Sequence, residues 1–150
     1  MDKSAKPLNE DDVMSANFTG SCLCGAVQFE SAAEPSFQAN CHCDDCRKSG
    51  GSVFASFVFV PVETFHLVQG ETQSHRHLAD SGNEVTKYFC ANCGSQIFNT
   101  SSGKPERVGI RVGVIDDAGW FQPKANVYCR AQLPSTPVDN QIASFDKMPR

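Results

Sequence analysis

The chain has 150 residues, of which 40% are hydrophobic and 20% charged, and its formal net charge is −4 at pH 7. A chain of this length and composition can bury a core of its own, which excludes a disordered or fibrous protein. Its negative charge repels polyanions, so we expect neither nucleic acid nor a membrane surface as a partner.

The chain is predicted to comprise a polar, flexible N-terminal tail over residues 1–17 and a single domain over residues 18–150. The tail carries an acidic run and shows no hydrophobic period. No stretch approaches the ~20 apolar residues of a membrane-spanning helix, and the first residues lack the basic flank and apolar run of a signal peptide. A cytoplasmic location is therefore expected. The sequence leaves the oligomeric state open, a homo-oligomer included.

From Phe18 onward, the chain shows the pattern of an all-β fold. Short segments rich in Val, Phe, Ile and Thr are interrupted about every ten residues by Gly, Pro, Asn or Asp. Strands are predicted over 26–30, 53–60, 64–68, 74–79, 85–89, 96–99, 107–115 and 125–130. A single helical turn is predicted over 44–49. The C-terminal part contains Pro123, Pro134 and Pro137. Because proline has no amide donor, we expect that part to wrap the sheet rather than run through its centre.

Two pairs of cysteines predict a structural metal site. In a reducing compartment, the eight cysteines indicate metal ligands or catalytic thiols rather than disulfides. Cys22 and Cys24 stand at the mouth of a strand, where alternation places both sulfurs on one face. Cys90 and Cys93 form a Cys-x-x-Cys turn that Gly94 can close. The two pairs supply four tetrahedral ligands, as in a structural zinc site that stabilises the fold.

The remaining cluster, Cys41, Cys43 and Cys46, predicts a different kind of site. Cys41 and Cys43 are expected on one face of a strand, with Cys46 brought round by a turn. Three protein ligands with an open fourth position are typical of a catalytic zinc. The sequence leaves open whether a side chain fills that position, and the candidates are His42, His66, His75, His77 and Cys129.

Alternation and neighbours favour other roles for most of these candidates. His42 alternates away from the cysteines on either side, so we expect it to pack or hydrogen-bond rather than ligate. His75 and His77 share a strand face and are expected to be solvated. Cys129, next to Tyr128, is expected to be a small buried apolar residue.

Three segments, GSCLCGAVQFE, NCHCDDCRKSGGSVFASFVF and KYFCANCGSQIF, resemble the glutathione-dependent formaldehyde-activating enzyme family, also described as the centromere protein V-like domain. The resemblance covers about residues 18–130. It implies a mainly β, Mss4-like zinc-containing domain with little helix. It also implies two zinc ions per chain, a structural ion on Cys22, Cys24, Cys90 and Cys93 and a catalytic ion on Cys41, Cys43 and Cys46.

An open zinc site with three thiolates favours thiol chemistry. Such a site has a net charge of −1 and is a weaker Lewis acid than zinc on three histidines, but a soft ion binds sulfur well. Coordination deprotonates a thiol that would otherwise titrate near ~8.5. We therefore expect a carbon–sulfur lyase type of enzyme that condenses glutathione, or a similar thiol, with formaldehyde or another small aldehyde to S-hydroxymethylglutathione. Arg47 and Lys48 are candidates to hold the carboxylates of glutathione.

The alternative function is a non-catalytic, zinc-stapled protein-binding module. The knuckle shape of all three clusters motivates it. The fourth ligand of the second zinc distinguishes the two readings, because a protein side chain there favours the module and an open position favours the enzyme. Phe54, Phe57 and Phe59 follow the third cluster, and alternation predicts that they belong to the core rather than to a pocket wall.

Overall fold

The protein, described as a computed structural model over residues 17–149, consists of two β-sheets and one short α-helix, α2 (Asp44–Gly50). The predicted tail lies outside the described residues, apart from Asn17. One sheet has the order β1-β2-β5 and the other the order β11-β10-β3-β4-β9-β8-β7-β6. The strands of the small sheet are β1 (Phe18–Ser21), β2 (Gln28–Ser31) and β5 (Phe65–Gln69). Those of the large sheet are β3 (Phe37–Cys41), β4 (Ala55–Pro61), β6 (Thr72–Leu78), β7 (Glu84–Cys90), β8 (Gln96–Ser101), β9 (Arg107–Arg111), β10 (Ala125–Val127) and β11 (Ala143–Ser144).

Strand β4 shows how the large sheet separates two layers. It pairs antiparallel with β3 on one side and β9 on the other. Its even-numbered residues Val58 and Val60 are fully buried in a core that also contains Phe29 of the small sheet. Its odd-numbered residues Phe57 and Phe59 pack on the opposite face, beside Cys41. The period of two therefore gives one strand a core face and a second face that is available for a site.

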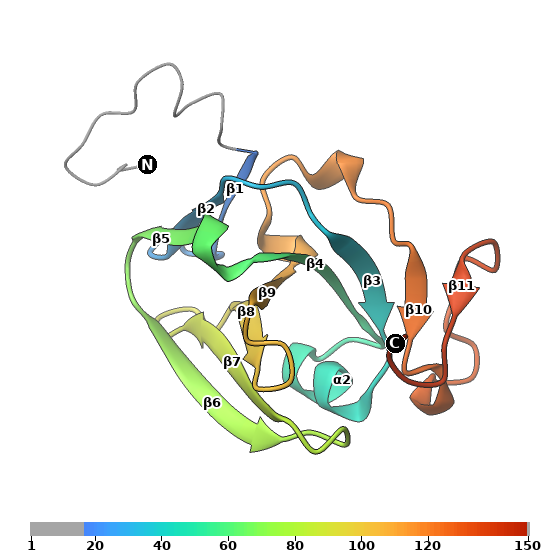
Figure 1. The fold of residues 1–150 in the computed structure, drawn as a ribbon. Helices are drawn as coiled ribbons and strands as arrows, with labels where there is room; N and C mark the ends of the chain where they lie inside the picture. Colours follow the sequence, from blue (N-terminus) through green and yellow to red (C-terminus); the bar gives the residue numbers. More distant parts are fainter. Residues whose placement is uncertain (1–16, 150) are drawn as a thin grey trace.

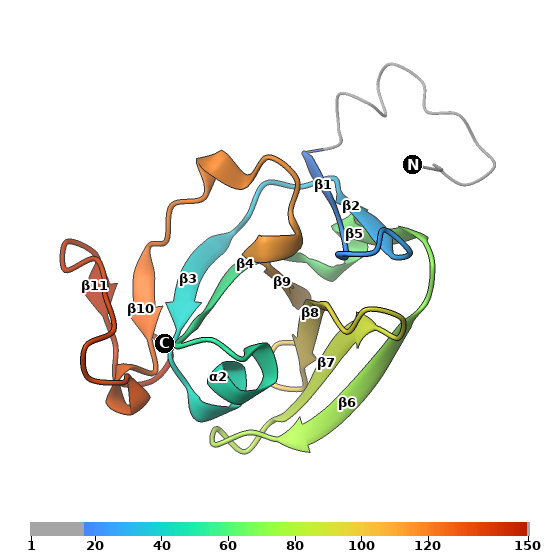
Figure 2. The same ribbon diagram turned by 180° about the vertical axis from the view of Figure 1, so that it is seen from behind.

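The large sheet curves, so that β6 at one end and β10 and β11 at the other approach the same space, with α2 at one side of it (Figures 1 and 2). Helix α2 begins at its N-cap Cys43, whose side chain accepts a hydrogen bond from the amide of Cys46. Asp44 and Asp45 occupy its first turn, where carboxylates favour the positive end of the helix dipole. It ends at Gly51, whose φ of 69° is the left-handed cap that glycine adopts without strain. No helix within residues 17–149 combines the length and apolar composition needed to cross a bilayer.

The mainly β class is confirmed, but three strands, β1, β3 and β11, were not predicted, and two predicted strands are too long. Strand β1 contains Gly20, and β3 contains Gln38, Ala39 and Asn40, which have weak strand propensity, so neither matches the sequence pattern. The predicted strand 107–115 ends at Arg111, and 125–130 ends at Val127, since a 3-10 helix follows each of them. The C-terminal segment joins the large sheet through β11, which pairs parallel with β10 at the edge.

Candidate functional site

The sulfurs of Cys22, Cys24, Cys90 and Cys93 converge from two turns. The first two residues lie between β1 and β2, Cys90 ends β7, and Cys93 follows in the turn before β8. The Sγ of Cys24 lies 3.7 Å from that of Cys22 and 3.8 Å from that of Cys90, and all four sulfurs are within 4.8 Å of one another. Tetrahedral zinc with Zn–S bonds of about 2.3 Å requires sulfurs about 3.8 Å apart. The four cysteines therefore fit a closed tetrahedral metal site.

Hydrogen bonds around this four-cysteine group prepare its sulfurs as ligands. The Ser95 hydroxyl accepts from the backbone N–H of Leu23 at 3.0 Å and lies 3.2 Å from the Sγ of Cys93. The Ser95 side chain is the largest cause that lowers the pKa of Cys93, to about 5. The Asn92 side chain is the largest cause that lowers the pKa of Cys24. A thiolate already favoured at neutral pH binds a metal ion without releasing a proton.

The second group joins the end of β3 to the start of α2. Cys41 is the last residue of β3, Cys43 is the N-cap of α2, and Cys46 lies in the first turn of the helix. Their three sulfurs lie within 4.8 Å of one another. The expectation that Cys41 and Cys43 share a strand face is wrong, because β3 ends at Cys41. The helix start, rather than strand alternation, turns Cys43 and Cys46 toward Cys41.

The three sulfurs interact strongly with one another. Cys41 and then Cys46 donate hydrogen bonds to the sulfur of Cys43, which lowers the pKa of Cys43 to about 2. The hydrogen bond to Cys43 is the largest cause that raises the pKa of Cys41, and burial raises it further. Cys43 is therefore the first thiolate of the trio. Soft, closely spaced sulfurs of this kind suit a thiophilic cation such as Zn²⁺.

Within residues 17–149, no histidine, cysteine or carboxylate completes the three-cysteine group. The His42 side chain is fully buried, and its ring lies 5.0 Å from that of Phe54, so it packs as expected. The Nδ1 of His77 lies 3.7 Å from an oxygen of Asp45. Cys129 is half-buried rather than buried, and its Sγ donates to the carbonyl of Asn126 at 3.4 Å. Among the described residues, no protein side chain therefore takes a fourth position beside the three sulfurs.

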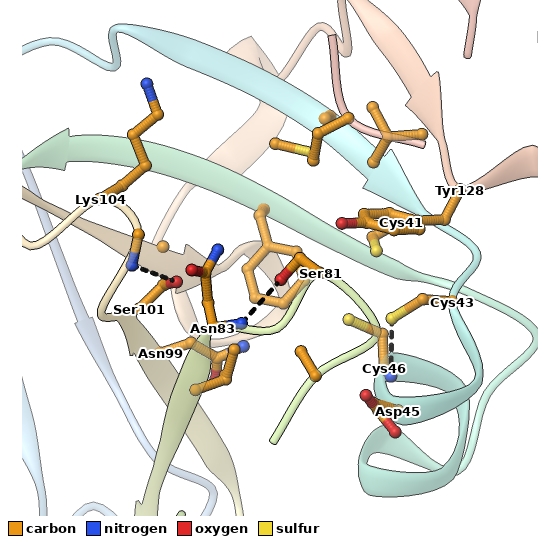
Figure 3. Close-up of a pocket in the computed structure, with 18 of the residues that line it drawn as sticks. Cys41, Cys43, Asp45, Cys46, Ser81, Asn83, Asn99, Ser101, Lys104 and Tyr128 are labelled. Atoms are coloured by element: carbon orange, nitrogen blue, oxygen red, sulfur yellow. Dashed lines mark hydrogen bonds between the residues drawn. The ribbon is translucent and has the colours of Figure 1, made fainter. Parts of the chain in front are cut away.

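The trio opens into a cavity of about 560 Å³, shown in close-up in Figure 3. Aromatic side chains form part of its wall, namely Phe37, Phe57, Phe59 and Tyr128. The prediction that Phe57 and Phe59 belong to the core rather than to a pocket wall is therefore only half right, since both also line the cavity. The hydroxyl and amide side chains of Ser81, Asn83, Asn99 and Ser101 lie between the cysteines and Lys104 (Figure 3).

The cationic residues of the cavity differ from those that the sequence suggested. Arg47 and Lys48 are not among the residues that line it, and Arg47 forms an ion pair with Asp44 of its own helix. Lys87, Lys104 and Arg107 line it instead. Spacing along the chain did not indicate these three residues, because they lie 40 or more residues from the trio. The available signal for Lys87 was its place in the middle of the predicted strand 85–89, between Val85 and Phe89.

Arg111 supports the trio from outside the cavity. It is 8% exposed, its guanidinium carbon lies 4.8 Å from the centre of the Phe57 ring, and its Nη2 donates to the Ser49 hydroxyl at 3.0 Å. Burial lowers the pKa of Arg111, whereas the neighbouring thiolates of the trio act in the opposite direction. Its positive charge thus offsets the negative charge that gathers on the sulfurs.

The structure is that of a mainly β protein with two cysteine-only groups, one of four sulfurs and one of three, that could each hold a metal ion. The family model described as "Glutathione-dependent formaldehyde-activating enzyme" matches residues 17–131. The chain belongs to this family, as the sequence motifs predicted. A crystal structure of a Rhodobacter sphaeroides protein, a structural genomics target, is similar, with 23% sequence identity and a TM-score of 0.54. The match covers 66% of this chain and 88% of that chain, and it supports the fold.

Proposed function

We propose that the protein is a zinc-dependent enzyme of the carbon–sulfur lyase type that condenses glutathione with formaldehyde, or another small aldehyde, to S-hydroxymethylglutathione. The observation that carries this proposal is the open trio of Cys41, Cys43 and Cys46 at the wall of a cavity. The family supports the same activity. The alternative, a protein-binding module, needs a closed second site, and the described residues supply no fourth ligand for one.

The two cysteine groups would hold two zinc ions with different roles. Cys22, Cys24, Cys90 and Cys93 would hold a structural ion, and the trio would hold the catalytic one. Zinc in the open site supplies a soft cation that keeps a bound external thiol ionised at neutral pH. The protein would supply three of the four zinc ligands, and the fourth coordination position would face the cavity.

The chemistry of the cavity fits a substrate that carries its thiol at one place and its charge at another. Lys104 lies across the cavity from the three cysteines, and Arg107, whose guanidinium carbon is 4.1 Å from the centre of the Phe59 ring, lines the same cavity. We assign to these two cations the carboxylates of glutathione. Asn83 and Asn99 lie between the two ends and can hydrogen-bond its peptide groups (Figure 3).

The assigned order of events places the thiol first. Once glutathione is held at both ends, its sulfur is fixed beside the cavity, and a small aldehyde needs only to reach that sulfur. Holding one reactant in place lowers the entropic part of the barrier. We place the protein in the cytoplasm, because a reducing compartment supplies glutathione and keeps its own thiols reduced.

Exchange NMR on glutathione and formaldehyde tests the proposal, since it follows the interconversion at equilibrium with and without protein. We expect the zinc-loaded protein to accelerate the exchange and the Cys46→Ser variant to lose this acceleration. Cys129→Ser is the matched control, because Cys129 belongs to neither group, and it should keep the activity. Exchange at the spontaneous rate with zinc-loaded wild-type protein would exclude this pair of substrates.

A further inference from the structure

Lys87 is a buried cation in the cavity that holds the trio. It lies in the middle of β7, opposite His75 of β6 and Asn99 of β8 in the register of the sheet. Only 5% of the residue is exposed, and it lines the same cavity as Cys43 and Cys46. Lysine is rarely buried to this extent unless its charge has a partner.

No carboxylate partner accompanies this cation in the part of the chain that the structure describes. The ion pairs there involve Arg47, His77 and Arg130, and no hydrogen bond of the Lys87 side chain is found among residues 17–149. The charge of Lys87 instead acts on the sulfurs of Cys43 and Cys46. Lys87 lines the cavity and has no acceptor there among the described residues, so a ligand that enters the cavity and supplies an acceptor can pair with its charge.

Neutralising the trio does not by itself account for Lys87. Arg111 already supplies a buried positive charge near the same sulfurs, and it is fixed by Ser49 and the ring of Phe57 without lining the cavity. Lys87 differs because it does line the cavity, where a ligand can reach it. Of the two cations, Lys87 is therefore the one that a ligand in the cavity can contact.

We propose that Lys87 is a catalytic residue that donates a hydrogen bond to the oxygen of the aldehyde while the sulfur of glutathione adds to its carbon. This inference rests on the proposed function. The sulfur lone pair forms the new C–S bond, the C=O π electrons move to oxygen, and the ammonium of Lys87 stabilises the resulting negative charge. The oxygen then takes up, through solvent, a proton equivalent to the one that the thiol released. Lys87 stays charged throughout, and no redox partner is needed.

The kinetic test compares Lys87→Met, which removes the charge at similar length, with Lys87→Arg, which keeps it. Removing one donor to a developing oxyanion typically lowers kcat by about 10²–10³-fold. We expect Lys87→Met to lower kcat by about a hundredfold with a nearly unchanged KM for glutathione, and Lys87→Arg to restore part of the loss. Lys124→Met is the control, because Lys124 is exposed and outside the cavity. Each variant is first checked for wild-type circular dichroism and zinc content.

A binding test gives a readout that does not depend on turnover. S-carboxymethylglutathione places a negative oxygen close to the sulfur, whereas S-ethylglutathione carries an uncharged S-substituent of similar size. Calorimetry on the zinc-loaded protein gives the ratio of their dissociation constants. Losing a hydrogen bond between charged groups predicts that Lys87→Met shifts this ratio against the carboxymethyl compound by about tenfold or more. If the role of Lys87 were purely structural, Lys87→Met would lower the affinity for both compounds by the same factor.

The outcomes separate this inference from the function on which it rests. Both are supported if the wild type is active and Lys87→Met has a lower kcat and a ratio of dissociation constants shifted against the carboxymethyl compound. Activity that survives intact in Lys87→Met overturns the role of Lys87 and leaves the proposed function standing. A higher KM with unchanged kcat also overturns it, because Lys87 would then only anchor glutathione. No acceleration by the wild type overturns both.

Discussion

Replacing Ser95 with alanine tests whether the four-cysteine group is a metal site whose sulfurs are prepared by their surroundings. The hydroxyl of Ser95 connects the two turns of the site, because it accepts from the Leu23 N–H at 3.0 Å and lies 3.2 Å from the Sγ of Cys93. Alanine removes both contacts. It also removes the largest cause of the low pKa of Cys93, so that pKa rises in the metal-free protein and zinc must displace a proton.

The structure sets the expected size of this effect. Loss of an outer hydrogen bond to a metal ligand typically lowers metal affinity by about 10–100-fold. Leu23 is exposed, so water can replace the hydroxyl as the acceptor of its N–H. The loss is thereby confined to the sulfur of Cys93, and we expect the zinc dissociation constant to rise by about tenfold, at the lower end of that range. At higher pH the difference should shrink, because Cys93 then ionises without help.

The assay is zinc competition with a chromophoric chelator at pH 7, in a Cys43→Ser background that leaves one site to load. Ser102→Ala is the matched control, since the Ser102 hydroxyl also accepts from a backbone N–H, that of Glu84 at 2.9 Å, but has no hydrogen bond to sulfur. Equal affinities for Ser95→Ala and Ser102→Ala would refute the reasoning. An unchanged pH dependence would show that the hydroxyl does not set the ionisation of Cys93.

Three further predictions concern the other centre and its cavity. Arg111→Met should lower zinc affinity at the trio by about 10–100-fold while the four-cysteine group stays loaded, measured as zinc per chain during chelator titration. Lys104→Gln should raise the KM for glutathione severalfold with little change in kcat, and the opposite pattern would contradict its role in binding a carboxylate. In metal-free protein at pH 6, iodoacetamide should label Cys43 before Cys41, because a lowered pKa leaves Cys43 ionised while the raised pKa of Cys41 keeps it protonated. Peptide mass spectrometry reads the order, and raising the pH should narrow the difference.

The cysteine groups could be predicted because each contains cysteines that are close together along the chain. A Cys-x-x-Cys turn such as Cys90 to Cys93 brings two sulfurs together whatever the rest of the fold does. The grouping of distant pairs was predicted from a count of ligands, and the structure brings the four sulfurs of those pairs together. The prediction of strands worked where β-branched and aromatic residues alternate, as in β4 and β7, and missed β3, whose Gln38 and Asn40 carry no such signal.

The walls of the cavity could not be predicted, because they depend on pairing between distant strands. Lys87 lines the cavity of the trio through the curvature of the large sheet, and Arg107 lines it because β9 pairs with β4. The sequence instead pointed to Arg47, which is adjacent to a ligand but turns to Asp44 on its own helix. Proximity along the chain pointed to cations that do not line the cavity, since a helix directs successive side chains around its axis.

Strand β7 connects the four-cysteine group to the cavity of the trio, because it carries Cys90 and the cavity-lining Lys87. The four-cysteine group ties the turn after β1, in the small sheet, to the turn after β7, in the large one, so a metal ion there would fix the sheets to each other. Cys90 of this group is the last residue of β7, and Lys87 lies three residues before it on the same strand. A site that takes no part in chemistry would therefore hold the strand that presents the cation to the aldehyde. Gly109 of β9 also lines the cavity, and it leaves room for Phe59, because a Cβ there would lie 2.8 Å from the Phe59 ring. The four-cysteine group and Gly109 therefore both contribute to the site of the trio only by positioning other residues, Lys87 in one case and Phe59 in the other.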